Sequence, residues 1–132
     1  MCGIFVAFNK GGLTETETKY NDFLKLIQHR GPDSSERYIS NEIYMGFNRL
    51  KILDLSSNAN MPMFSKDERY VLVFNGEIYN YKELKKEFLE DFDFKSSSDS
   101  EVILAGYQKY GLDFFEKMSG MWALLIYDTL NQ

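Results

Sequence analysis

The sequence predicts an α+β domain of layered sheets and helices, and three observations support this prediction. The length of 132 residues is that of one ordinary domain. Apolar residues make up 44% of the chain and include 11 Phe and 9 Tyr, so a sizeable core can form. Apolar runs typical of strands are mixed with segments of helical periodicity along the whole chain.

The first expected element is a buried strand at residues 3–8, where the side chains are β-branched and aromatic. A helix is expected next, because Thr14 and Glu17 have the spacing of a capping box. Gly31, in the left-handed conformation, and Pro32 are expected to end it. The apolar residues that fall on one face of this helix are Tyr20, Phe23, Leu24 and Ile27.

Further strands are expected at residues 36–39, 43–53 and 70–74. The segment 55–68 between the last two predicts a loop, and loops of that length are uncommon unless they have a function. The Asn75-Gly76 pair that follows is typical of a turn between two strands.

The last third of the chain predicts more helices and a final strand. Helices are expected from Asn80, from Ser98 and over residues 112–118, with a short strand at 92–95. Residues 120–128 form a near-continuous apolar run that predicts a strand buried on both faces. Such a strand needs neighbours, so we expect a longer protein or self-association through the exposed strand edge.

Composition excludes several classes of function. A net charge of −5 argues against nucleic acid as a partner, because no basic block exists to neutralise phosphates. One cysteine and one histidine cannot form a zinc site, and no glycine pattern for nucleotides is present. The single cysteine fits a reducing compartment, and neither a membrane span nor a signal peptide is evident, so we expect a cytoplasmic domain.

Cys2 is the only cysteine and follows the initiator methionine directly. As a structural residue, it is a small buried side chain at the start of a strand. As a nucleophile, it needs a base, which His29 or its own α-amino group could supply. Removal of Met1, which a small second residue permits, would free that amine with a pKa of about 7.7–8.0.

Five other residues each have a structural and a functional interpretation. Arg49 is either an edge arginine or a bidentate carboxylate ligand, and Asn75 with Gly76 forms either a turn or an oxyanion hole. Glu77 and Asp99 are either a surface acid and a helix N-terminal acid, or the partners of a substrate ammonium. A thiol, an amine, an oxyanion hole and these charges together suit hydrolysis of an amide on an amino acid.

Six strings in fixed order support a resemblance, namely MCGIF, HRGPD, NRLKILD, FNGEIYN, SDSEVI and GMWALLIYD. They resemble the class II glutamine amidotransferases and are most similar to the glutaminase domain of asparagine synthetases. The resemblance covers residues 1–132. It implies the N-terminal nucleophile hydrolase fold, a four-layer αββα sandwich of two antiparallel sheets, here incomplete on its C-terminal side.

The resemblance also implies a mechanism and a set of site residues. Met1 is removed, Cys2 attacks the glutamine amide to form a thioester, and the amine of Cys2 is the base. Asn75 and the Gly76 N–H form the oxyanion hole. The remaining roles concern binding: Arg49 holds the substrate carboxylate, and Glu77 and Asp99 hold its ammonium group.

The same resemblance implies a partner domain. The family passes ammonia to a C-terminal synthetase domain that uses ATP and magnesium, whereas this chain needs no cofactor itself. Residues 1–132 are therefore expected to be a fragment of a longer protein, with a homo-oligomer as a further possibility. One departure is Met61 before Pro62, where family members often have Gln-Pro.

Two alternatives stay open at this point. The first is a non-catalytic interaction or regulatory module that keeps the same fold. The second is another class II member, such as a phosphoribosyl or hexosamine-phosphate amidotransferase. The HRGPD string at residues 29–33 weighs against the second alternative, because those enzymes tend to vary at the proline position.

Overall fold

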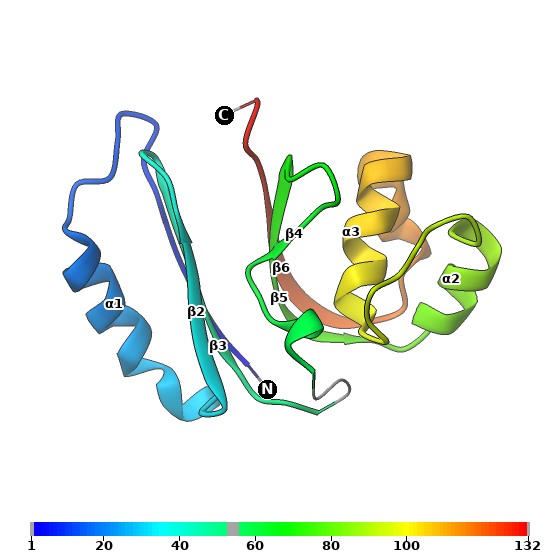
Figure 1. Cartoon of the computed structure of the whole chain (residues 1–132), viewed down its shortest axis with the longest axis horizontal. Helices are drawn as coiled ribbons and strands as arrows, with labels where there is room; N and C mark the ends of the chain where they lie inside the picture. The colour runs from blue at the N-terminus through cyan, green and yellow to red at the C-terminus, as the bar shows by residue number, and fades with distance from the viewer. Residues whose placement is uncertain (1, 53–55, 132) are drawn as a thin grey trace.

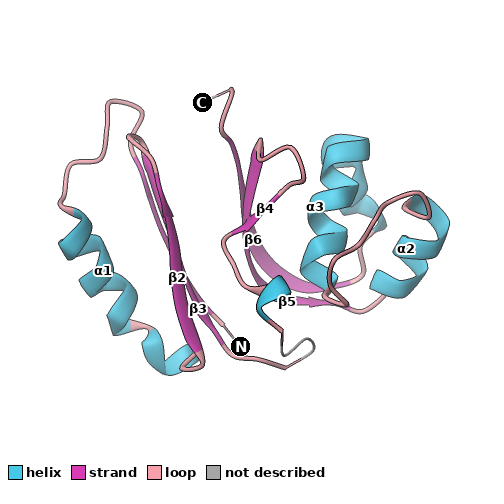
Figure 2. Ribbon diagram, viewed as in Figure 1, coloured by secondary structure: helices cyan, strands magenta, loops and turns pink. Residues whose placement is uncertain are grey.

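The computed structural model describes residues 2–52 and 56–131, which form four layers. Helix α1 (Glu17–Leu26) covers one sheet, and helices α2 (Tyr81–Phe88) and α3 (Asp99–Tyr110) cover the other, as Figure 1 shows. The two sheets face each other between these helix layers (Figure 2). The α+β class and the expected sandwich of two antiparallel sheets are confirmed.

The first sheet has the strand order β1-β3-β2 and is antiparallel throughout. Its strands are β1 (Gly3–Phe8), β2 (Ser34–Ile39) and β3 (Ile43–Arg49). The central strand β3 is buried at every position. Because Gly3 is opposite Asn48, the start of β1 lies beside the end of β3. This register brings Cys2 to the segment that follows Arg49.

The second sheet has the order β4-β5-β6 and is also antiparallel. It contains β4 (Met63–Phe64), β5 (Tyr70–Ile78) and β6 (Gly120–Asp128). The turn expected at Asn75-Gly76 is wrong, because β5 continues through both residues and pairs with β6 as far as Ile78. A Cβ on Gly76 would lie 2.3 Å from the Met121 carbonyl oxygen, so this glycine permits close approach of β6 instead of a turn.

Several helix details also differ from expectation. Helix α1 is capped by Thr16, whose hydroxyl accepts the Lys19 N–H, and not by Thr14. After α1, the 3-10 helix η1 (Gln28–Arg30) leads to Gly31, whose φ of −154° is not left-handed. Glycine is required there because a Cβ would lie 2.2 Å from the Asn48 carbonyl oxygen.

The remaining elements lie in the loops and after α3. The 3-10 helices η2 (Ser57–Ala59) and η3 (Gly111–Lys117) occupy part of the expected loop and the expected brief helix. Residues 92–95 do not form a strand, and Phe92 and Phe94 pack against the hydrophobic core from an irregular segment. The strand expected over 43–53 ends at Arg49, and its predicted end at Leu53 lies outside the described residues.

Strand β6 is not buried on both faces along its whole length. Met121 is 56% exposed and Trp122 is 37% exposed, whereas Tyr127 is buried. Helix α3 and η3 cover one side of the second sheet, and sheet packing buries the later residues of β6. Within the described part of the chain, no helix is long and apolar enough to cross a membrane.

Candidate active site

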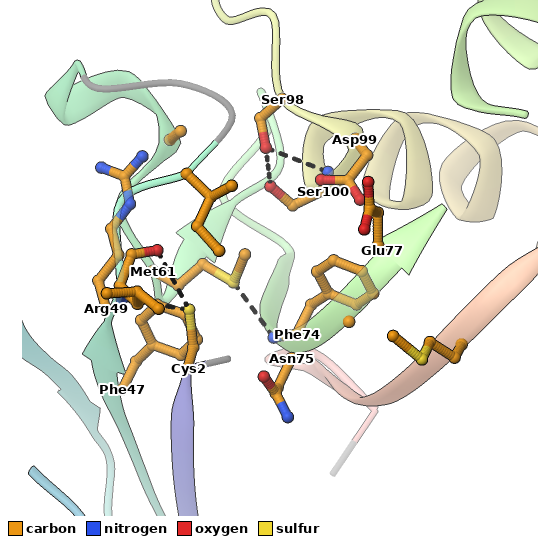
Figure 3. Close-up of a pocket in the computed structure, with 15 residues that line it drawn as sticks. Cys2, Phe47, Arg49, Met61, Phe74, Asn75, Glu77, Ser98, Asp99 and Ser100 are labelled. Atoms are coloured by element: carbon orange, nitrogen blue, oxygen red, sulfur yellow. Dashed lines mark hydrogen bonds between the residues drawn. The ribbon is translucent and has the colours of Figure 1, made fainter. Parts of the chain in front are cut away.

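A cavity of about 130 Å³ lies where the ends of the two sheets meet the start of α3. All six residues predicted from the sequence line it, although they come from four separate segments. Figure 3 shows Cys2 on one side of the cavity and the carboxylates of Glu77 and Asp99 on the other. The predicted residues are Cys2, Arg49, Asn75, Gly76, Glu77 and Asp99.

The position of Cys2 is fixed by contacts from two directions. Arg30 donates from Nε to the Cys2 carbonyl oxygen at 3.0 Å. The Leu50 N–H donates to the Cys2 sulfur at 3.3 Å. The thiol in turn faces the Leu50 carbonyl oxygen, with an S···O distance of 3.7 Å. The sulfur therefore lies half-buried at the cavity wall with a backbone donor beside it.

The HRGPD string at residues 29–33 forms the support for this end of the site. Besides Arg30, Asp33 accepts the Lys51 N–H on Oδ2 at 2.8 Å and donates its own N–H to the Arg49 carbonyl at 3.0 Å. His29 is exposed and is not among the residues that line the cavity. His29 therefore does not share the cavity with Cys2.

Strand β5 directs its backbone N–H groups alternately to its two edges. The Tyr79 N–H donates to Ser119 at 2.7 Å and the Thr129 N–H donates to Arg69 at 2.9 Å, so odd-numbered positions bond to β6. In an antiparallel ladder, the even-numbered positions must then point away from β6.

Three of the even-numbered N–H groups of β5 donate to side chains, whereas Leu72 is opposite Met63 of β4. The Tyr70 N–H donates to Ser65 Oγ at 2.9 Å, the Phe74 N–H to Met61 Sδ at 3.1 Å and the Ile78 N–H to Asp99 Oδ2 at 2.9 Å. Gly76 lies between the last two and lines the cavity. The alternation therefore directs the Gly76 N–H to the edge of β5 away from β6, and Asn75 lines the same cavity.

Asp99 begins α3, and Ser98 caps this helix by accepting the Ser100 N–H at 3.2 Å. The Asp99 carboxylate is only 4% exposed. Burial raises the pKa of Asp99 above its ordinary value, and the nearby charge of Glu77 raises it further, against backbone hydrogen bonds that lower it. Two acids at this end of the cavity create a site that favours a cation.

Arg49 is 5% exposed and supplies a positive charge on the Cys2 side of the cavity. Its Nη1 donates to the Ser56 carbonyl at 2.7 Å and to Asn60 Oδ1 at 2.6 Å. These bonds fix the plane of the guanidinium. The cavity thus has a cationic side and an anionic side, which suits a zwitterionic amino acid.

Sequence reasoning missed several residues of the cavity wall. Met61 is buried and contacts the backbone of β5 through its sulfur, and Ser100 and Met121 also line the cavity. The signals in the sequence were the position of Met61 in an unusually long loop and its place before Pro62, where members of the resembled family often have glutamine. No cluster of three or more potential metal-ligating side chains is present in residues 2–52 and 56–131.

Comparison with known proteins identifies the family. The sequence profile described as "Glutamine amidotransferase domain" matches residues 1–132. The chain belongs to this glutamine amidotransferase family. The expected resemblance is thereby confirmed over the full length of the chain.

Asparagine synthetases are among the similar curated relatives. The chain is 38% identical to asparagine synthetase B [glutamine-hydrolyzing] of Escherichia coli, over 98% of this chain and 23% of that protein. It is 40% identical to asparagine synthetase [glutamine-hydrolyzing] 1 of Bacillus subtilis, over 97% of this chain and 21% of that protein. The amidotransferase chain therefore spans about a fifth of the length of these relatives.

A solved structure supports the fold. Glutamine phosphoribosylpyrophosphate amidotransferase from B. subtilis matches with a TM-score of 0.56 and 20% sequence identity. The match covers 68% of this chain and 22% of that chain. At this identity the likeness concerns the fold alone.

Proposed function

We propose that this amidotransferase domain hydrolyses the side-chain amide of glutamine to glutamate and ammonia through a thioester on Cys2. The observation that supports the proposal is the Gly76 N–H on the free edge of β5, in a cavity that Cys2 and Asn75 also line. A backbone donor beside a side-chain amide is an oxyanion hole, and a thiol at the same cavity is the matching nucleophile.

The first half of the reaction forms the thioester. Removal of Met1 gives Cys2 a free α-amino group, which takes the thiol proton while the sulfur attacks the amide carbon. The Asn75 Nδ2 and the Gly76 N–H donate to the oxygen that becomes negative in the tetrahedral intermediate. The intermediate collapses by breaking the C–N bond, and the α-ammonium returns its proton to the departing ammonia.

The second half releases glutamate. Water attacks the thioester carbon while the same α-amine accepts a proton from it, and the oxyanion hole is used again. Breaking of the C–S bond restores the thiol and gives the glutamate carboxylate. The Cys2 amine therefore serves as base and acid in each half, so no further catalytic side chain is required.

Charge complementarity orients the substrate. We assign Arg49 to the α-carboxylate of glutamine, and Glu77 with Asp99 to its α-ammonium group. Support comes from the separation of these charges on opposite sides of the cavity (Figure 3). A bound ammonium also compensates the buried Asp99 carboxylate, which burial otherwise destabilises.

The wider role is proposed from the relatives. Residues 1–132 are the glutaminase domain of a longer cytoplasmic protein, and a following synthetase domain uses the ammonia with ATP and magnesium. The printed names of the relatives as glutamine-hydrolysing asparagine synthetases support this role.

The test combines mass and activity. Intact mass spectrometry should show loss of Met1, and the chain should release glutamate and ammonia in equal amounts from glutamine. Cys2→Ala should release neither, whereas Cys2→Ser should retain a trace, because a hydroxyl is a poorer nucleophile at neutral pH. Retention of Met1, or turnover by Cys2→Ala near the wild-type rate, would refute the mechanism.

A further inference from the structure

One backbone donor of β5 bonds to a sulfur atom where a strand partner would normally bind it. The Phe74 N–H donates to the Met61 thioether, with an N···S distance of 3.1 Å, and both residues are buried. Thioethers are weak acceptors, so a buried N–H seldom has one as its partner. Phe74 immediately precedes the proposed oxyanion donors Asn75 and Gly76.

The ladder between β4 and β5 explains why this donor needs a partner. The Ser65 N–H donates to the Tyr70 carbonyl, and Met63 is opposite Leu72 in the same register. Continuing this antiparallel pattern by one rung places Met61 opposite Phe74, in a position where backbone hydrogen bonds would form. Because β4 begins only at Met63, the side chain of Met61 supplies the acceptor in place of its backbone.

Met61 also lines the cavity, on the same side of β5 as the Gly76 N–H. The Met61 sulfur at Phe74 and the Asp99 carboxylate at Ile78 are therefore the two anchors on either side of Gly76. Because the Phe74 and Ile78 N–H groups are both bonded, the direction of the Gly76 N–H between them is fixed. Without the sulfur bond, the first anchor is lost and a buried donor is left unpaired, which favours a backbone shift.

We infer that Met61 is a positioning residue: its thioether holds the Phe74 N–H and so fixes the direction of the Asn75-Gly76 oxyanion donors. This inference rests on the proposed function. It assigns Met61 no contact with the reacting atoms. Its effect is transmitted through the backbone of β5 and should be seen in kcat more than in KM, because the oxyanion forms only after substrate binds.

Two substitutions separate the acceptor from the bulk of the side chain. Met61→Leu keeps an apolar side chain of similar volume and removes the sulfur acceptor. Met61→Gln keeps the length and offers an amide oxygen as a stronger acceptor. Met63→Leu is the matched control, because Met63 is also a buried methionine of this sheet but lies on the wall of a different cavity.

The measurements are amide hydrogen exchange at Phe74 by NMR and steady-state hydrolysis of glutamine by the full chain. In the wild type, the Phe74 amide should be protected. In Met61→Leu, its exchange should accelerate about tenfold or more, and kcat should fall roughly tenfold to a hundredfold with KM nearly unchanged. Met61→Gln should restore both, and Met63→Leu should change neither.

Three results would overturn the inference: an unprotected Phe74 amide in the wild type, wild-type exchange and kcat in Met61→Leu, or no rescue by Met61→Gln. The wild-type exchange needs no variant, so misfolding of one variant does not prevent a decision. Absence of glutamine hydrolysis by the wild type would instead refute the proposed function. Exchange at Phe74 would still show whether the sulfur holds the strand.

Discussion

Replacement of Asn75 by alanine removes one of the two proposed oxyanion donors and leaves the other in place. The backbone of β5 should not move, because the substitution leaves in place both the pairing with Ala123 and Trp122 of β6 and the contacts of the Phe74 and Ile78 N–H groups. Loss of one such donor typically lowers kcat by about 10²–10³. KM for glutamine should change little, because the oxygen gains its charge only in the transition state.

The same substitution should have little effect on folding. Asn75 Oδ1 is buried and has no donor within the described residues, so truncation to alanine removes an unsatisfied acceptor together with some packing. These effects oppose each other, and the free energy of unfolding should stay within about 1 kcal/mol of the wild type. Asn75→Ala is thus predicted to lower kcat strongly while the free energy of unfolding stays nearly unchanged.

The assay for Asn75→Ala pairs glutamate release over a range of glutamine concentrations with thermal unfolding. Asn80→Ala is the control, since Asn80 Nδ2 donates to the Lys117 carbonyl at 2.9 Å and its Oδ1 accepts the Ser119 N–H at 2.8 Å. That control should lower Tm and leave kcat near the wild-type value. A raised KM with unchanged kcat in Asn75→Ala would move Asn75 from catalysis to ground-state binding.

Three further predictions concern other parts of the site. His29→Ala should leave kcat near the wild-type value, because His29 is exposed and outside the cavity wall. Loss of thioester formation in a folded variant would instead indicate that His29 is the base for Cys2. For Asp99, burial raises the pKa above 3.8, so KM for glutamine should rise as pH falls through that raised pKa. Asp99→Asn should abolish this pH dependence and bind glutamine poorly. It should also unfold at a higher temperature than the wild type at neutral pH, because the raised pKa in the folded state means that ionisation of Asp99 destabilises the fold. A lower Tm for this variant at neutral pH would contradict burial as the cause of the raised pKa. Gly76→Ala should unfold at a lower temperature, since its Cβ would lie 2.3 Å from the Met121 oxygen, and a wild-type Tm would show that β6 moves freely.

Local patterns were enough to predict the elements that have their own periodicity or cap. The strand at residues 3–8, the helix that Ser98 caps and the apolar strand at 120–128 are all present. The error at Asn75-Gly76 has a different origin. The pair is typical of turns in isolation, but β6, more than 40 residues later in the chain, pairs with β5 through both positions. Tertiary pairing overrides a local turn preference.

The candidate site could be predicted as a set of residues but not as a geometry. Cys2, Arg49 and Asp99 each had an ordinary structural interpretation, and they were selected because their chemistry together suits amide hydrolysis and because the strings around them resemble a known family. Which of them share a cavity depends on the register of two sheets, and no local pattern encodes that register. Met61 was noted only for its place before Pro62, and its contact with Phe74 could not be predicted, because that contact depends on β4 beginning at Met63 and not at Met61.

The spacing along β5 also sets a length that a substrate must match. In the proposed mechanism the Gly76 N–H donates to the reacting carbonyl, and the Ile78 N–H holds Asp99, the carboxylate proposed to bind the ammonium group. Two residues of extended strand separate these donors by about 7 Å, and a hydrogen-bonded strand cannot shorten. This fixed spacing therefore selects ligands by the distance between their amide carbonyl and their ammonium group. Asparagine, shorter by one methylene, cannot reach both ends at once, and a mismatch of this size is worth about 10–200-fold in kcat/KM.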